Sequence, residues 1–360
     1  MTIEKTEQPA DWTEPGAHAV GRGIHRIPLP LPLTGLTAVN AYVLEGPDGL
    51  VLIDPGWQSE VNERAITTSL RSLGHQLGDV VICLATHHHW DHYTQAYAWR
   101  DSLGIKLFTG RGEGHSIGAF RPDGTRFPEH PALLARCGAD DLAERLRTEP
   151  TPDYEADMPF GPPDTWLDHG DRIALREGEL EVIATPGHTR GHSVFAHTNA
   201  GVVFSGDHVL PRITPSLGFE LSPEPRPLRS FLRSLELLLD RPDSVLLPAH
   251  GPVTPSTHKR ARELLEHHRE RLDKVADILM AGASTAYEVA GQLPWTRHRR
   301  RLDHLELEHQ MSAVMEIEAH LDVLALLGRA SATAGAPVRH YTANCPAPAN
   351  RHPGVEYRRL

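Results

Sequence analysis

The segment HHHWDH at residues 87–92 places four imidazoles and one carboxylate within six residues. It directly follows the apolar run Val80–Ala85, whose unbroken hydrophobic character is typical of a buried strand. Crowding so many polar groups at the end of a buried strand costs desolvation free energy unless a cation compensates for it. Imidazole nitrogens and carboxylate oxygens are common ligands of divalent transition metals. The segment therefore predicts a metal site at a sheet edge, where an α/β layer presents side chains to a crevice.

Three later segments show the same arrangement, a His or Asp beside a Gly after an apolar strand. They are TPGHT at residues 185–189, SGDH at 205–208 and PAHG at 248–251. A glycine lets the backbone turn tightly and approach a neighbouring group closely. Each segment alone is weak evidence, but their shared position at strand ends predicts that all four segments meet.

The order of apolar runs predicts a layered α/β domain over residues 21–255. Strands are expected at residues 24–31, 38–44, 50–53, 80–85, 106–109, 173–175, 179–185, 193–197, 202–205 and 245–247. Helices with 3.6-residue spacing are expected at residues 60–73, 92–103 and 228–239.

The remaining segments differ from this pattern. Residues 1–20 are polar and predicted to be disordered, and residues 111–166, rich in Pro, Gly and charge, are predicted to form a cap with a helix at 140–147. Residues 256–330 are predicted to form a small helical domain, and residues 331–360 a flexible tail. The expected helices of that domain cover residues 257–280, a segment opening with a capping box at Thr285 and Glu288, and residues 308–327.

Five motifs, LIDPG at 52–56, THHHWDH at 86–92, TPGHT, SGDH and PAHG, together resemble the metallo-β-lactamase superfamily. Within it they resemble the glyoxalase II-like branch and the related lactamase-like endoribonucleases. The resemblance covers roughly residues 20–255 and implies a four-layer αββα sandwich. The C-terminal helices, closing with EAHL at 318–321 and LG at 327–328, resemble more loosely the winged-helix module of the endoribonuclease branch.

The resemblance also implies a complete dinuclear site for two divalent metal ions. By its pattern the first metal is held by His87, His89 and His188, and the second by Asp91, His92 and His250. Asp207 is expected to bridge both metals, and Asp54 to support the site from behind. A ligand set of imidazole and carboxylate without thiolate favours Zn²⁺ and leaves Fe and Mn open.

A hydrolase is the function that this resemblance implies. Two metals lower the pKa of a shared water, and Asp91 is expected to orient that water and carry its proton to the leaving group. The leading substrate class is a small-molecule thioester or ester, such as an acyl-CoA, acyl-carrier or glutathione thioester. One alternative is a single-strand endoribonuclease. Another is a mononuclear-iron persulfide dioxygenase, which resembles this chain only at the first triad and Asp207.

Several other residues are weaker candidates for contacts with substrate. Arg212 and His208, which follow the bridging Asp, are expected at the border of the cleft, and His88 is expected to point away from the ligands. The basic cluster at residues 297–301 either forms a solvated loop or binds a phosphorylated part of the substrate.

Composition limits the partners and the compartment. A net charge of -11 disfavours nucleic acid and anionic membranes, and no apolar stretch approaches the ~18 residues of a membrane span. The three cysteines, Cys83, Cys137 and Cys345, are far apart and form no CxxC pair, which fits a reducing compartment. The N-terminus lacks the apolar core of a secretory signal. A soluble cytoplasmic enzyme is expected, whose C-terminal module could form a homodimer surface.

Overall fold

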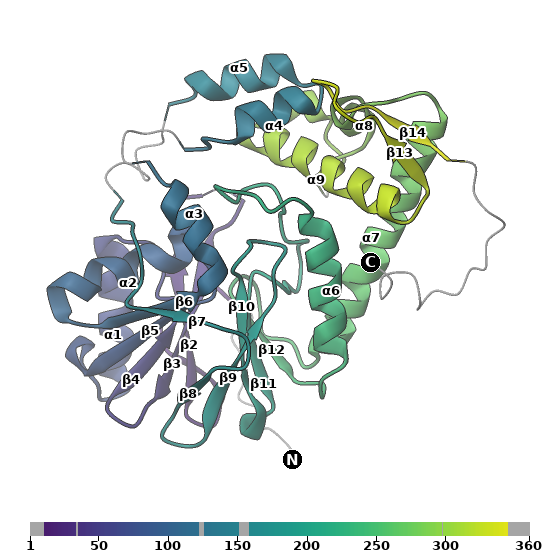
Figure 1. The fold of residues 1–360 in the computed structure, drawn as a ribbon. Helices are drawn as coiled ribbons and strands as arrows, with labels where there is room; N and C mark the ends of the chain where they lie inside the picture. Colours follow the sequence, from purple (N-terminus) through teal and green to yellow (C-terminus); the bar gives the residue numbers. More distant parts are fainter. Residues whose placement is uncertain (1–10, 34, 122–125, 151–157, 297, 345–360) are drawn as a thin grey trace.

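The computed structural model describes residues 11–33, 35–121, 126–150, 158–296 and 298–344. Two sheets face each other and helices cover their outer faces (Figure 1). The predictions for residues 1–10, for Arg297 of the basic cluster and for residues 345–360, with Cys345, lie outside the described residues.

The first sheet has seven strands whose spatial order is their order in the chain. They are β1 (His18–Gly21), β2 (Ile24–Pro30), β3 (Ala38–Glu45), β4 (Leu50–Ile53), β5 (Val80–Ala85), β6 (Lys106–Gly110) and β7 (Thr165–Leu167). Strands β1 to β4 pair antiparallel, whereas β4 to β7 pair in parallel. Parallel strands need crossover connections, and the helices α1 (Glu60–Ser72) and α2 (Trp90–Leu103) supply two of them. The carboxyl ends of β4 and β5 therefore meet at one edge.

The second sheet has five strands in the order β12-β11-β10-β9-β8. They are β8 (Arg172–Ala174), β9 (Glu179–Ala184), β10 (Ser193–His197), β11 (Val202–Gly206) and β12 (Val245–Pro248). Only β11 and β12 run parallel here, and the helix α6 (Pro227–Leu239) makes their crossover. Asp207 and His250, which follow these two strands, consequently lie at the same edge.

Three layers of apolar contact hold the sandwich together. Between the sheets, side chains from both pack together, and Tyr42 of β3 meets Phe204 of β11 edge to face with ring centroids 5.1 Å apart. Outside the first sheet, α1 and α2 bury residues such as Leu70 and Trp99. Outside the second sheet, α6 buries Phe231. The predicted four-layer αββα architecture is confirmed.

The predicted cap is more helical than its composition indicates. It contains the short helices α3 (Gly114–Ala119), α4 (His130–Arg136) and α5 (Asp140–Thr148). Only the last was predicted. Leu134 of α4 and Leu142 of α5 are buried in the core that includes the C-terminal helix α9 (Leu307–Leu326). Helices this short gain their stability from tertiary packing, which a local pattern does not reveal.

The C-terminal region contains the expected helices α7 (Thr257–Met280), α8 (Ala286–Gln292) and α9. The capping box is confirmed, since Thr285 accepts from the backbone N–H of Glu288 and the Glu288 carboxylate accepts from that of Thr285. These helices share one apolar core with α6 and the second sheet. The C-terminal region is thus packed onto the sandwich rather than standing apart from it.

Two predictions of disorder were wrong. Residues 18–20 belong to β1, which pairs with β2, and so are not part of a disordered N-terminus. Strand β13 (Ala330–Ala332) pairs with β14 (Tyr341–Ala343), so residues 331–344 are not a flexible tail. Tyr341 is only 1% exposed, and this long-range burial orders a segment whose own composition carries little apolar character. In the described part of the chain, no helix combines the length and hydrophobicity needed to cross a membrane.

The β13–β14 hairpin should contribute to the stability of the whole chain. We expect Tyr341→Ala to lower the free energy of unfolding by about 3 kcal/mol, because it empties a buried aromatic site. Urea unfolding followed by fluorescence measures the change. Ser331→Ala, in the same hairpin but in an exposed hydrogen bond, is the control. An unchanged urea midpoint for the Tyr341 variant would mean that the hairpin is dispensable.

Candidate metal centre

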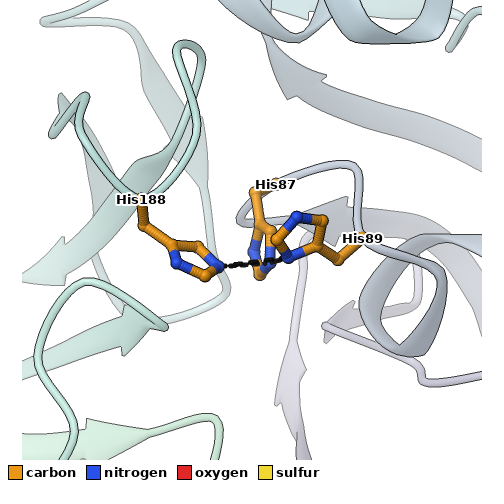
Figure 2. Close-up of side chains that lie close together, drawn as sticks. All are labelled: His87, His89 and His188. Carbon is orange, nitrogen blue, oxygen red and sulfur yellow. Dashed lines mark hydrogen bonds between the residues drawn. The ribbon is translucent and has the colours of Figure 1, made fainter. Parts of the chain in front are cut away.

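Three histidine nitrogens converge at the carboxyl end of β5. His87 and His89 lie on the turn between β5 and α2, and His188 on the turn between β9 and β10 (Figure 2). His87 Nε2 lies 2.9 Å from His89 Nδ1, and His188 Nε2 lies 3.3 Å from the former and 3.1 Å from the latter. Nitrogens that bind one tetrahedral Zn²⁺ at about 2.0–2.1 Å are about 3.3 Å from one another. The three predicted ligands of the first metal therefore have nearly the spacing of a metal triad.

Hydrogen bonds behind two of these rings orient them. His188 Nδ1 donates to the carbonyl oxygen of Ser216 at 2.6 Å, which leaves Nε2 with its lone pair. The hydroxyl of Thr86 donates to Asp54 Oδ2 at 2.9 Å and so accepts from His87 Nδ1 at 3.0 Å. Such bonds to the outer nitrogen set the tautomer that a metal-binding histidine needs.

A second cluster joins Asp91 and His92, at the start of α2, to His250 after β12. Asp91 Oδ2 lies 3.4 Å from His250 Nε2 and 3.6 Å from His92 Nε2. His250 Nδ1 donates to the carbonyl oxygen of Ala38 at 2.8 Å, so its Nε2 points into the cluster with a free lone pair. These are the three residues predicted for the second metal.

Asp207 lies between the two clusters and turns a different oxygen to each. Its Oδ2 is 3.6 Å from His188 Nε2, and its Oδ1 is 3.3 Å from His250 Nε2. Gly206 allows this placement, since its φ is +49° and a Cβ there would lie 2.5 Å from the Thr86 hydroxyl. A carboxylate in this position can bind two cations at once.

Three atoms at the second cluster that could bind a cation lack any other partner in the described part of the chain. His92 Nε2, His250 Nε2 and Asp207 Oδ1 are buried, and within the described residues none of them has a hydrogen-bond partner. Buried polar atoms without partners are rare because each costs desolvation free energy. A divalent cation at the point where these atoms converge would give all three of them a partner. The residues present therefore fit a bound divalent cation.

Comparison with known proteins agrees with this geometry. A family profile described as the metallo-beta-lactamase superfamily matches residues 34–250, which is more than half of the chain. The chain belongs to the metallo-β-lactamase superfamily. Within that superfamily it is a metallo-hydrolase and is therefore an enzyme.

Three relatives extend the likeness beyond the matched segment. The chain is 24% identical over 321 residues to a probable metallo-hydrolase, YqjP, of Bacillus subtilis, covering 83% of this chain and 90% of that protein. It is similar in structure to the metallo-beta-lactamase family protein TTHA1429 of Thermus thermophilus, with a TM-score of 0.70, 28% identity and coverage of 91% and 100% of the two chains. A Burkholderia ambifaria beta-lactamase domain protein gives a TM-score of 0.71 at 26% identity, covering 95% and 97%.

Electrostatics in the second cluster favour positive charge. Burial alone would lower the pKa of His92, but three carboxylates outweigh it and raise that pKa to about 10. They belong to Asp91, Asp54 and Asp207. Asp54 lies behind the ring, with its Oδ2 3.1 Å from His92 Nδ1. Its supporting role stays a prediction.

The first triad has the opposite character. Burial, together with the neighbouring imidazoles, lowers the pKa of both His87 and His89 well below the ordinary histidine value. Neutral imidazole is the form that binds metal, so these rings need not lose a proton at neutral pH to do so.

Two buried residues support the ligands but were not predicted. His192 accepts from the backbone N–H of Asp207 at 3.2 Å and thereby helps to hold the bridging carboxylate. Glu113, just after β6, bonds both the His88 ring and the Thr189 hydroxyl, and so ties the two histidine turns together. The strand-end rule that found the ligands would also have found Glu113. His88 is thus turned toward Glu113 and belongs to neither ligand cluster.

The two residues predicted to contact substrate, His208 and Arg212, differ in their exposure to solvent. His208 is fully buried and packs edge to face on Phe231 with ring centroids 5.0 Å apart, so the prediction that it touches substrate was wrong. The side chain packs under α6. Arg212 is exposed, and its charge helps to lower the pKa of Asp11 after the stronger effect of hydrogen bonds from Thr13. Its role toward substrate stays a prediction.

A buried carboxyl near the ligand turns should make stability depend on pH. Burial, and then the charge of Glu113, raises the pKa of Glu220 to about 7 from its ordinary 4.5. The folded protein therefore holds this proton more tightly than the unfolded chain, so stability falls as pH rises from about 4.5 to about 7. We expect Glu220→Gln to remove this loss, which is on the order of 3 kcal/mol.

Urea unfolding of metal-free protein at pH 5 and pH 8 measures the effect. The stability of the Glu220 variant relative to the native chain should rise between the two pH values. Glu149→Gln, at an exposed carboxyl, is the matched control. Parallel pH dependence of the native chain and the Glu220 variant would contradict the expectation.

Proposed function

We propose that this chain is a dinuclear hydrolase in which His87, His89 and His188 bind one divalent cation and Asp91, His92 and His250 bind the other. Asp207 links the two cations. The observation that carries the proposal is the placement of Asp207, whose two oxygens face the two clusters at 3.6 and 3.3 Å. Zn²⁺ suits this set of nitrogen and oxygen donors best.

Two divalent cations, when bound, supply a water of near-neutral pKa and polarise the carbonyl of a substrate. The protein contributes orientation and proton transfer. His87 and His92 are fully buried, whereas Asp91 is 7% exposed and Asp207 9%. His89 is more exposed than either carboxylate, so we expect water and substrate to approach from the side of His89 and the two carboxylates. Asp91 is placed there to accept a proton from the attacking water and pass it to the leaving group.

A thioester or ester of a small acyl group is the substrate class that we propose. The support is a group of partly buried aromatic side chains in the cap, which contacts His88, the residue between His87 and His89 in the chain. Phe160 lies 6.2 Å, centroid to centroid, from His88 and 4.7 Å from Phe120 of the cap. An apolar cap close in the chain to the ligand turn suits an acyl chain better than a phosphodiester, and the glyoxalase II-like motifs agree with this.

One observation favours an endoribonuclease as the second candidate. Helices α7 to α9 followed by the β13–β14 hairpin have the element order of a winged helix, a fold that binds nucleic acid in many proteins. Arg299, Arg300 and Arg301 are exposed in the same region. The net charge of -11 weighs against this candidate. The second cluster weighs against a mononuclear-iron dioxygenase, because an enzyme that binds a single metal would have no use for a second set of ligands.

Loss of one ligand from each cluster tests the metal site. We expect the native chain to bind two equivalents of Zn²⁺, and His188→Ala and His250→Ala to bind one each. Both should lose turnover by at least about 100-fold, because the reaction needs both cations. Metal analysis after dialysis, with hydrolysis of a thioester panel beside single-stranded RNA and a persulfide, gives the readout. His304→Ala, an exposed histidine outside both clusters, is the control.

The outcomes separate the candidates. Thioester cleavage with two metals supports the main proposal, and RNA cleavage with two metals supports the second candidate. A chain that retains two metals and full turnover in both His→Ala variants would refute the proposed ligand set. One bound iron with oxygen consumption would refute the hydrolase itself.

A further inference from the structure

The orientation of His188 depends on a loop that follows the bridging Asp. This loop carries Ser216, whose carbonyl oxygen accepts the 2.6 Å hydrogen bond from His188 Nδ1. The bond leaves the lone pair of Nε2 pointing toward His87 and His89. Whatever holds the Ser216 carbonyl in place therefore also holds the first triad in its metal-binding geometry.

Helix α9 holds this loop from one side. The hydroxyls of Ser216 and Ser312 share a hydrogen bond of 2.8 Å, and the backbone N–H of Gly218 donates to the same Ser216 oxygen at 3.2 Å. The loop lies directly on the helix, since a Cβ at Gly218 would come within 2.7 Å of the Ser312 Cα. Ser312 is only 8% exposed, so water competes poorly for its hydroxyl.

The cap holds the loop from the other side. His130 at the start of α4 is fully buried and its Nε2 donates to the carbonyl oxygen of Gly218 at 3.1 Å. An ion pair between Arg126 and Glu308 joins the cap to the first turn of α9. The loop is thus clamped between the cap and α9, and Ser312 is its direct contact with the latter.

We propose that Ser312 is a positioning residue of the first cation site, acting through Ser216 on His188. The inference rests on the proposed function, because it requires His188 to bind the cation. Helix α9 then helps to set the geometry of the metal centre. Removing the Ser312 hydroxyl takes away one of the two hydrogen bonds that hold the Ser216 hydroxyl, loosens the carbonyl behind His188 and weakens the first site without touching a ligand.

Cobalt binding to the full-length protein tests this, because the visible spectrum of Co²⁺ reports the ligand geometry of each site. We expect Ser312→Ala to weaken one of the two Co²⁺ sites by about 10-fold, the lower end for loss of an outer hydrogen bond. The other site should keep its affinity. A competing chelating indicator measures both constants. Ser216→Ala keeps the carbonyl but loses the hydroxyl and with it the hydrogen bonds to both Ser312 and Gly218, so it should weaken the same site at least as much.

A double-mutant cycle separates positioning from general destabilisation. If the two hydroxyls act through their shared bond, Ser216→Ala/Ser312→Ala should bind Co²⁺ no more weakly than Ser216→Ala alone. Ser331→Ala, which removes a hydroxyl hydrogen bond elsewhere in the C-terminal region, should leave both constants unchanged.

Three results would overturn the inference. They are unchanged Co²⁺ binding by Ser312→Ala, equal weakening of both sites, and additive effects in the double variant. In each of these the native chain still binds two Co²⁺ ions, so the proposed function stands. A native chain that binds no Co²⁺ would overturn the proposed function and this inference together.

Discussion

The burial of imidazole nitrogens and carboxylate oxygens at one edge of the sandwich is the constraint on which the rest of the structure depends. Two cores of apolar strands bring these groups together, and removing them from water carries a free-energy cost that their mutual contacts do not fully offset. Atoms such as His92 Nε2 and Asp207 Oδ1 have no hydrogen-bond partner among the described residues. A bound cation is the compensation that this arrangement requires.

Around that edge, the protein orients three of the histidine ligands by a hydrogen bond to the outer nitrogen of the ring. Backbone carbonyls orient His188 and His250, and a chain of hydrogen bonds through Thr86 and Asp54 orients His87. None of these partners reaches the point where the ligands converge. The geometry of the centre is therefore set by groups several ångströms behind it, which are also the groups that loops and neighbouring helices can influence.

The C-terminal helices consequently have a closer relation to the metal centre than their position in the chain indicates. They share a core with α6 and the second sheet, and α9 contacts both the cap and the loop behind His188. A region that looked like a separate helical domain in sequence lies against the loop and the cap that support the site. Its hairpin and the short cap helices are ordered by the same packing.

The sequence by itself determined the layered architecture, most element bounds and the residues that cluster at the sheet edge. These follow from short-range patterns: apolar runs, a capping box at Thr285, and polar residues beside glycine at strand ends. Tertiary structure alone decided that Glu113 joins two histidine turns, that His208 is buried, and that Ser312 lies against Ser216, 96 residues away in the chain. Such contacts depend on how whole elements pack, and no local pattern records which surfaces will meet.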